Sequence, residues 1–192
     1  MSWDVSIDIE TLSTRPNALI TQIGACLFDR RSGEIHEEVF LSNCHYNDRW
    51  PFHKPYDVDH KTVMWWLDQA KEASQSLSNP APVYIRQALN DLSGWMDAMG
   101  FISQSREITM RVWANAPTFD LTILRHAMSV ENVVCPWHYR QEHCMRTICT
   151  LAKELDDIPI IINEEGLVAH RADHDAIRQA RIIGHATRII HA

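Results

Sequence analysis

Two acidic residues near the N-terminus have the spacing of metal ligands. Asp8 and Glu10 lie in a segment where Val5, Ile7 and Ile9 alternate with polar residues, which is the period-two pattern of a β-strand. Both carboxylates therefore point to the same face, about 7 Å apart along the strand. They repel each other unless a cation lies near them, and hard divalent cations prefer oxygen ligands of this kind. The pair alone is equally compatible with an acidic, solvent-facing strand.

A third acid follows a later predicted strand. Asp120 lies at the end of the segment 111–120, just inside a predicted helix. The helix macrodipole favours a negative charge at this position, and Thr118 is a plausible N-cap residue. Taken alone, Asp120 is therefore either a routine acid of a first helical turn or a third ligand.

The segment 170–175 combines a histidine with a fourth acid. His170 and Asp175 lie at the start of the predicted C-terminal helix. On one continuous helix their side chains would point about 140° apart, so they can share a site only if His170 lies in the loop before the helix. An imidazole there can accept a proton near neutral pH. His174, directly before Asp175, is a rival base.

The elements that must position these residues are three strands followed by alternating helices and a strand. Hydrophobic periodicity and turn residues predict strands near 5–10, 19–28 and 34–41, with a turn at 29–33 and a loop over 43–57. Helices are predicted from Asp59 to about 70, at 82–99, 118–129, 146–155 and 172–190, with a strand at 107–114. This order predicts an α/β fold: a mixed sheet with its first three strands antiparallel, flanked by helices.

Composition sets further bounds. The 192 residues, 45% of them hydrophobic, fit a single domain, 1–192. No apolar stretch approaches the roughly 20 residues of a membrane span, and the five cysteines contain no C-x-x-C pair, so a reduced, cytoplasmic protein is expected. The net charge of −7 argues against a protein that coats nucleic acid. Cys135, His138, His143 and Cys144 lack the paired spacing of structural zinc sites.

Together, D-x-E at 8–10, N-x-x-x-F-D at 115–120 and H-x-x-x-x-D at 170–175 resemble the three motifs of the DEDDh exonucleases. The resemblance is closer to the branch that includes the mycobacterial 3′→5′ exoribonuclease and the phage exodeoxyribonuclease DexA. It covers nearly the whole chain, through 7–12, 18–25, 62–67, 146–147 and 169–175. Arg171, directly after His170, departs from the usual motif of that branch.

The resemblance implies a ribonuclease H-like fold and a two-metal site. Asp8, Glu10, Asp120 and Asp175 would hold two Mg²⁺ or Mn²⁺ ions roughly 4 Å apart, with His170 as the general base. The implied reaction releases nucleoside 5′-monophosphates from the 3′ end of RNA or single-stranded DNA, and similar nucleases form homodimers. Further residues expected to contact or support the substrate are Thr11, Leu12, Asn115, Phe119, Trp66 and Arg146.

Two other functions use the same residue types. A ribonuclease H-like endonuclease would also bind metals through carboxylates, but the close D-x-E pair together with His170 favours the exonuclease. A catalytically inactive, nucleic-acid-binding relative would have lost an acid, and all four are present. No residue in the sequence identifies a contact with the RNA 2′-hydroxyl.

Overall fold

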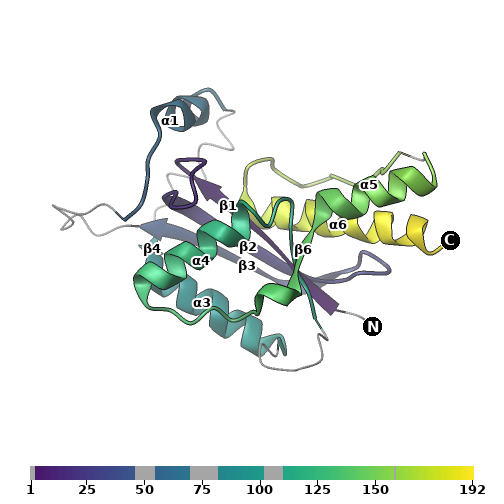
Figure 1. Ribbon diagram of the computed structural model, residues 1–192, viewed down its shortest axis with the longest axis horizontal. Coiled ribbons are helices and arrows are strands. Elements are labelled where there is room, and N and C mark those ends of the chain that lie inside the picture. Colours follow the sequence, from purple (N-terminus) through teal and green to yellow (C-terminus); the bar gives the residue numbers. More distant parts are fainter. Residues whose placement is uncertain (1–2, 46–54, 70–81, 102–109, 158) are drawn as a thin grey trace.

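The computed structural model describes residues 3–45, 55–69, 82–101, 110–157 and 159–192. A six-stranded sheet in the order β4-β3-β2-β1-β5-β6 forms its centre (Figure 1). The strands β1 to β3 are antiparallel, whereas β4, β5 and β6 run parallel to their neighbours β3, β1 and β5. The strands are β1 Trp3–Thr11, β2 Ile20–Asp29, β3 Ile35–His45, β4 Val83–Tyr84, β5 Val112–Ala114 and β6 Glu142–Cys144.

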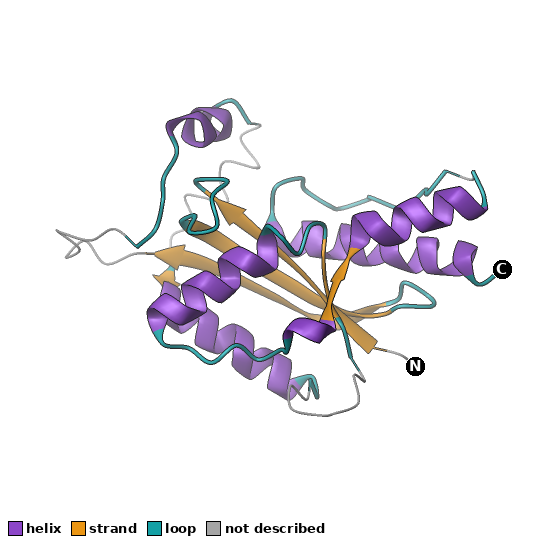
Figure 2. Cartoon of the chain, in the orientation of Figure 1, coloured by secondary structure: helices purple, strands orange, loops and turns teal. Residues whose placement is uncertain are grey.

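Helices cover both faces of this sheet. Figures 1 and 2 show α3 and α4 on one face and the neighbouring α5 and α6 on the other, while α1 stands apart from the sheet. The helices are α1 His60–Leu67, α3 Ile85–Ala98, α4 Asp120–Glu131, the short 3₁₀ helix η2 Tyr139–Gln141, α5 Met145–Leu155 and α6 Ala172–Ile190. Of the helices described, none is both long and apolar enough to cross a bilayer.

Two apolar clusters attach the helices to the sheet. The alternate residues Val5, Ile7 and Ile9 of β1 join the larger cluster, together with apolar residues of α3 and α4. On the opposite face, Trp113 packs with Ala176 and other small or branched residues of α6. Because side chains alternate across a strand, the acids of β1 face α6.

The predicted α/β class with three antiparallel first strands is confirmed. The last helix has the predicted bounds, but β4, η2 and β6 were not predicted, since elements of two or three residues show no periodicity. Of the strand predicted at 107–114, only 110–114 lies within the described residues. The predicted Thr118 cap is wrong, because α4 begins after Phe119 without a side-chain cap.

Close backbone contacts hold α6 against the sheet. A Cβ atom on Gly24 of β2 would overlap the backbone of Ala172 and Asp173, and one on Gly184 would overlap that of Gly33. Beside Gly24, the Gln22 side-chain oxygen accepts a hydrogen bond of 2.7 Å from the Ala172 N–H, which satisfies one of the free donors at the start of a helix. The first turn of α6 is therefore fixed relative to β1 and β2.

The substitution Gly24→Ala is expected to lower the free energy of unfolding by about 3 kcal/mol, because the added methyl group must displace the α6 backbone. Denaturation in urea would measure this loss. The control is Gly94→Ala in α3, where an added Cβ meets no atom within 4 Å. This control should stabilise by about 0.5–1 kcal/mol, as expected for glycine replaced within a helix. Equal stability of Gly24→Ala and wild type would contradict the close packing.

Candidate active site

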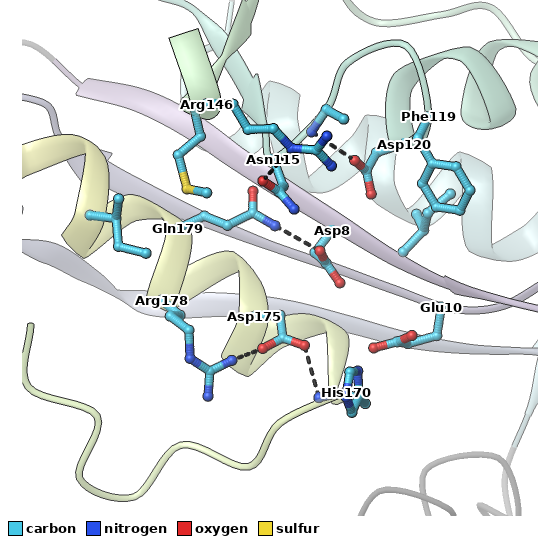
Figure 3. Close-up of a pocket in the computed structure, with 14 residues that line it drawn as sticks. Asp8, Glu10, Asn115, Phe119, Asp120, Arg146, His170, Asp175, Arg178 and Gln179 are labelled. Atoms are coloured by element: carbon cyan, nitrogen blue, oxygen red, sulfur yellow. Dashed lines mark hydrogen bonds and ion pairs between the residues drawn. The ribbon is translucent and has the colours of Figure 1, made fainter. Parts of the chain in front are cut away.

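All four acids singled out from the sequence line one cavity of about 500 Å³, together with His170 (Figure 3). Asp8 and Glu10 come from the end of β1, Asp120 is the first residue of α4, and Asp175 lies in the first turn of α6. Potential ligand atoms of Glu10, His170 and Asp175 all lie within 4.8 Å of one another. Segments that are distant in the sequence thus bring carboxylates together.

The pKa values of these acids show the cost of bringing them together. Burial first, and then the charges of Asp120 and Glu10, raise the pKa of Asp8 well above its ordinary value. Burial and Asp120 raise the pKa of Glu10 to about 8, and burial raises that of Asp120 to about 6 although backbone N–H groups oppose the shift. A divalent cation would relieve this repulsion, and the oxygen donors fit hard ions.

His170 lies outside α6, as a shared site requires. Its backbone has a positive φ of 59°, the left-handed conformation that histidine adopts more readily than most residues, and α6 begins at Ala172. The His170 N–H donates a hydrogen bond of 2.9 Å to Asp175 Oδ2. The loop therefore turns back over the first turn of α6 and brings the imidazole to Glu10 and Asp175.

Two tryptophans of α1 pack against the His170 ring. The centroid of the imidazole lies 4.8 Å from that of Trp65 and 6.0 Å from that of Trp66, both edge to face. Burial, followed by the charge of Arg178, lowers the pKa of His170. The imidazole is therefore neutral at pH 7 and able to accept a proton.

Trp66 does not have the role expected from the sequence. Its ring is only 3% exposed, and its Nε1–H donates a hydrogen bond of 2.9 Å to the backbone oxygen of Thr11. The expected contact of Trp66 with the substrate is thus contradicted, since a buried ring offers no free face. The neighbouring Trp65 is 42% exposed, so one member of the pair is buried and the other faces outward.

The rival base, His174, faces another way. Its Nδ1 accepts a hydrogen bond of 2.8 Å from the Val168 N–H, and its Nε2 lies 3.9 Å from Asp173 Oδ2. It is absent from the cavity wall, to which His170 contributes. The geometry favours His170 as the base.

The remaining residues expected at the substrate divide into two groups. Asn115, Phe119 and Arg146 line the cavity; Arg146 Nε donates to Asn115 Oδ1 at 3.2 Å, and Phe119 also packs against the core. Thr11 and Leu12 lie beside the cavity rather than in its wall, and the Thr11 hydroxyl donates to the Ser13 oxygen at 2.7 Å. Contact of these residues with a nucleotide stays a prediction.

Two polar cavity residues of α6 were not predicted from the sequence. Arg178 forms ion pairs with Asp175 and with Glu164, and Gln179 Nε2 donates a hydrogen bond of 2.7 Å to Asp8 Oδ1. Residues three and four positions after Asp175 share its helix face. Their spacing from Asp175 could therefore have predicted that both residues face the site.

A family model described as the 3′-5′ exoribonuclease Rv2179c-like domain matches residues 3–187. The chain belongs to this family. The match confirms the resemblance to a 3′→5′ exoribonuclease family that the three motifs indicate. No curated protein sequence matches this Rv2179c-like chain.

Solved structures confirm the fold. Cell-death related nuclease 4 (CRN-4) is 18% identical with a TM-score of 0.62, over 96% of this chain and 63% of its own. Exonuclease I from Methylocaldum szegediense is 13% identical with a TM-score of 0.65, over 95% and 40%. The nuclease domain of 3′hExo, a DEDDh family member bound to rAMP, is 13% identical with a TM-score of 0.59, over 99% and 92%. The Rv2179c-like chain therefore has the ribonuclease H-like fold, and it spans less than two thirds of CRN-4 and exonuclease I.

The raised pKa values predict a metal-free protein that is less stable at higher pH. Folding raises the pKa of Glu10 from 4.5 to about 8 and that of Asp120 from 3.8 to about 6, so the folded state binds more protons between these values and stability falls as the pH rises. In EDTA, the melting temperature should fall by at least about 5 °C between pH 5 and pH 8.

Glu10→Gln should remove the part of this pH dependence that comes from Glu10, leave the parts that come from Asp8 and Asp120, and melt above wild type at pH 8. Glu37→Gln, at an exposed position of β3, is the matched control and should behave as wild type. A wild-type melting temperature that rises over this interval would show that the acids are not forced together.

Proposed function

We propose that this Rv2179c-like domain is a divalent-metal-dependent exonuclease that shortens RNA or single-stranded DNA from the 3′ end and releases nucleoside 5′-monophosphates. The observation that carries the proposal is the convergence of Asp8, Glu10, Asp120, Asp175 and His170 on one cavity. The clustered ligand atoms of Glu10, His170 and Asp175 support the same reaction.

In this proposal the four carboxylates hold two Mg²⁺ or Mn²⁺ ions. Bound ions of this kind activate water and stabilise the charges that develop at phosphorus during in-line displacement. The raised pKa values of Asp8, Glu10 and Asp120 support the assignment, since these acids keep protons that a cation would displace. Asp175 is already oriented by the His170 N–H.

The protein side chains supply the proton transfer and the binding surface. A nitrogen of the neutral His170 imidazole takes the proton of the attacking water, which its position beside Glu10 and Asp175 allows. Arg146, whose guanidinium lies at the cavity wall beside Asn115, contacts a phosphate of the substrate. Phe119 packs against the terminal nucleotide, and the exposed Trp65 is better placed than Trp66 to stack on a base.

The family description supports RNA as substrate. Solved structures with the same fold are described with different ligands: 3′hExo with rAMP and Escherichia coli exonuclease I with a dT13 oligonucleotide. Nucleic acid is the shared substrate class, so RNA and DNA have to be compared directly. A homodimer and a cytoplasmic location stay predictions.

The direct test uses RNA and DNA strands labelled at the 5′ end, single-stranded or with a 3′ overhang, incubated with Mg²⁺ or Mn²⁺. Wild type should give a ladder that shortens stepwise from the 3′ end, and EDTA should abolish it. Asp175→Asn should reduce the rate by more than about 100-fold, since losing even a group that supports a metal ligand costs about 10–100-fold.

Each alternative has its own product pattern in this assay. Internal cuts by wild type would identify a ribonuclease H-like endonuclease. Binding without cleavage in both metals would identify an inactive relative. Full activity of Asp175→Asn would refute the metal site proposed here.

His170→Asn is expected to lower kcat by about 100-fold or more, the usual contribution of a general base. Asparagine tolerates the positive φ at this position, so the loop should be retained and the loss attributable to the imidazole. His174→Asn is the matched control and should keep most of the activity, because His174 faces Val168 and Asp173. A larger loss in His174→Asn than in His170→Asn would reverse the assignment of the base.

A further inference from the structure

Three of the four carboxylates receive a hydrogen bond that fixes their orientation. The His170 N–H donates to Asp175, and the Ala116 N–H donates to Asp120 Oδ2 at 3.4 Å. Both donors are backbone N–H groups that lie five and four positions before their acids in the sequence. Asp8 instead receives the Nε2 of Gln179 at 2.7 Å, a side-chain donor on α6 (Figure 3).

Gln179 is held tightly in the position from which it reaches Asp8. Its side chain is 5% exposed, and it lies one turn after Asp175 on a helix whose backbone is seated on Gly24. The ionised form of Asp8, which is the form that binds a cation, only accepts hydrogen bonds, so the NH₂ group of Gln179 faces it. Its Oε1 is buried and accepts no hydrogen bond from the described residues.

We propose that Gln179 is a positioning residue of the metal site, which holds Asp8 Oδ1 so that Oδ2 is presented to a divalent ion. The inference rests on the proposed function. A neutral amide can orient Asp8 without adding a positive charge that would compete with the ion. In this respect Gln179 differs from Arg178, whose guanidinium already pairs with Asp175. One face of α6 thus carries the proposed ligand Asp175 in its first turn and, in the next turn, Gln179, which supports the proposed ligand Asp8.

This role predicts a loss of metal affinity when Gln179 is replaced. Without the Nε2 donor, Asp8 is free to rotate, and Mn²⁺ affinity should fall by roughly 10-fold, as when groups that support metal ligands are removed elsewhere. An apolar side chain of similar size removes the buried, unpaired Oε1, but it also leaves the buried Asp8 Oδ1 without its donor, so some loss of stability in EDTA is expected as well. A purely structural glutamine would instead lower stability when replaced and leave metal affinity unchanged.

The experiment measures Mn²⁺ binding to the full chain by the loss of the free-ion EPR signal, and melting temperature in EDTA, for wild type, Gln179→Leu and Gln179→Met. Both variants are expected to bind Mn²⁺ about 10-fold more weakly, and the melting temperature in EDTA checks that each variant stays folded. The unbranched methionine retains the length of glutamine, so it reports on the donor even if the branched leucine packs poorly.

Thr187→Val is the matched control. Thr187 lies on the same helix, is 4% exposed, and also has a buried side-chain oxygen without a partner among the described residues, but it lies two turns beyond Gln179. Its replacement should leave Mn²⁺ binding unchanged.

The outcomes separate the inference from the proposed function. Wild type that binds no Mn²⁺ and shortens no strand would refute the proposed function itself. Wild type that binds Mn²⁺ while Gln179→Met binds it equally well would overturn only the role of Gln179. Equally weakened Mn²⁺ binding by Thr187→Val would also overturn the role of Gln179, because any substitution in α6 would then be enough to weaken metal binding.

Discussion

The placement of four carboxylates in one cavity, with mutual repulsion among Asp8, Glu10 and Asp120, is the constraint that the rest of this structure must overcome. Asp8, Glu10, Asp120 and Asp175 come from β1, α4 and α6, so only tertiary packing can force them into one cavity. In the metal-free protein, protons absorb part of the cost, as the raised pKa values of Asp8 and Glu10 show. The same acids would repel a nucleic-acid backbone until cations are bound. Under the proposed function, metal loading would therefore precede substrate binding, in a chain whose net charge is already −7.

Helix α6 is packed closely on the sheet and therefore holds its site residues in fixed positions relative to β1. Gly24 leaves room for the backbone of the first turn of α6, and the Gln22 side chain accepts a hydrogen bond from that turn. Near the other end of the helix, the backbone of Gly184 contacts that of Gly33. Between these contacts, Ala176 and Ala180 pack on the sheet. Glycine and alanine residues thus allow the backbones of α6 and the sheet to lie close together. The polar residues in the first two turns of α6 face the acids of β1.

The sequence predicted the parts of the site that depend on local periodicity. Asp8 and Glu10 alternate with the apolar residues of β1, and the bounds of α6 agree with its helical pattern. The parts set by distant partners escaped prediction. Which tryptophan of the adjacent pair is buried depends on the Thr11 oxygen that accepts from Trp66. The role of Gln179 depends on Asp8, 171 positions away. Strand β6 exists only because β5 offers it a hydrogen-bonding edge.

The contacts at Gly24 and Gly184 also limit how such a protein can diversify. A helix seated directly on strand backbone leaves a void if it moves outward, so α6 keeps a fixed distance from the acids of β1. Under the proposed function, side chains that reach the rest of a substrate come from neighbouring elements, among them Trp65 of α1 and Arg146 of α5. Substitutions in these elements would then change the preference for ribose or deoxyribose strands while the cluster of acids stays in place.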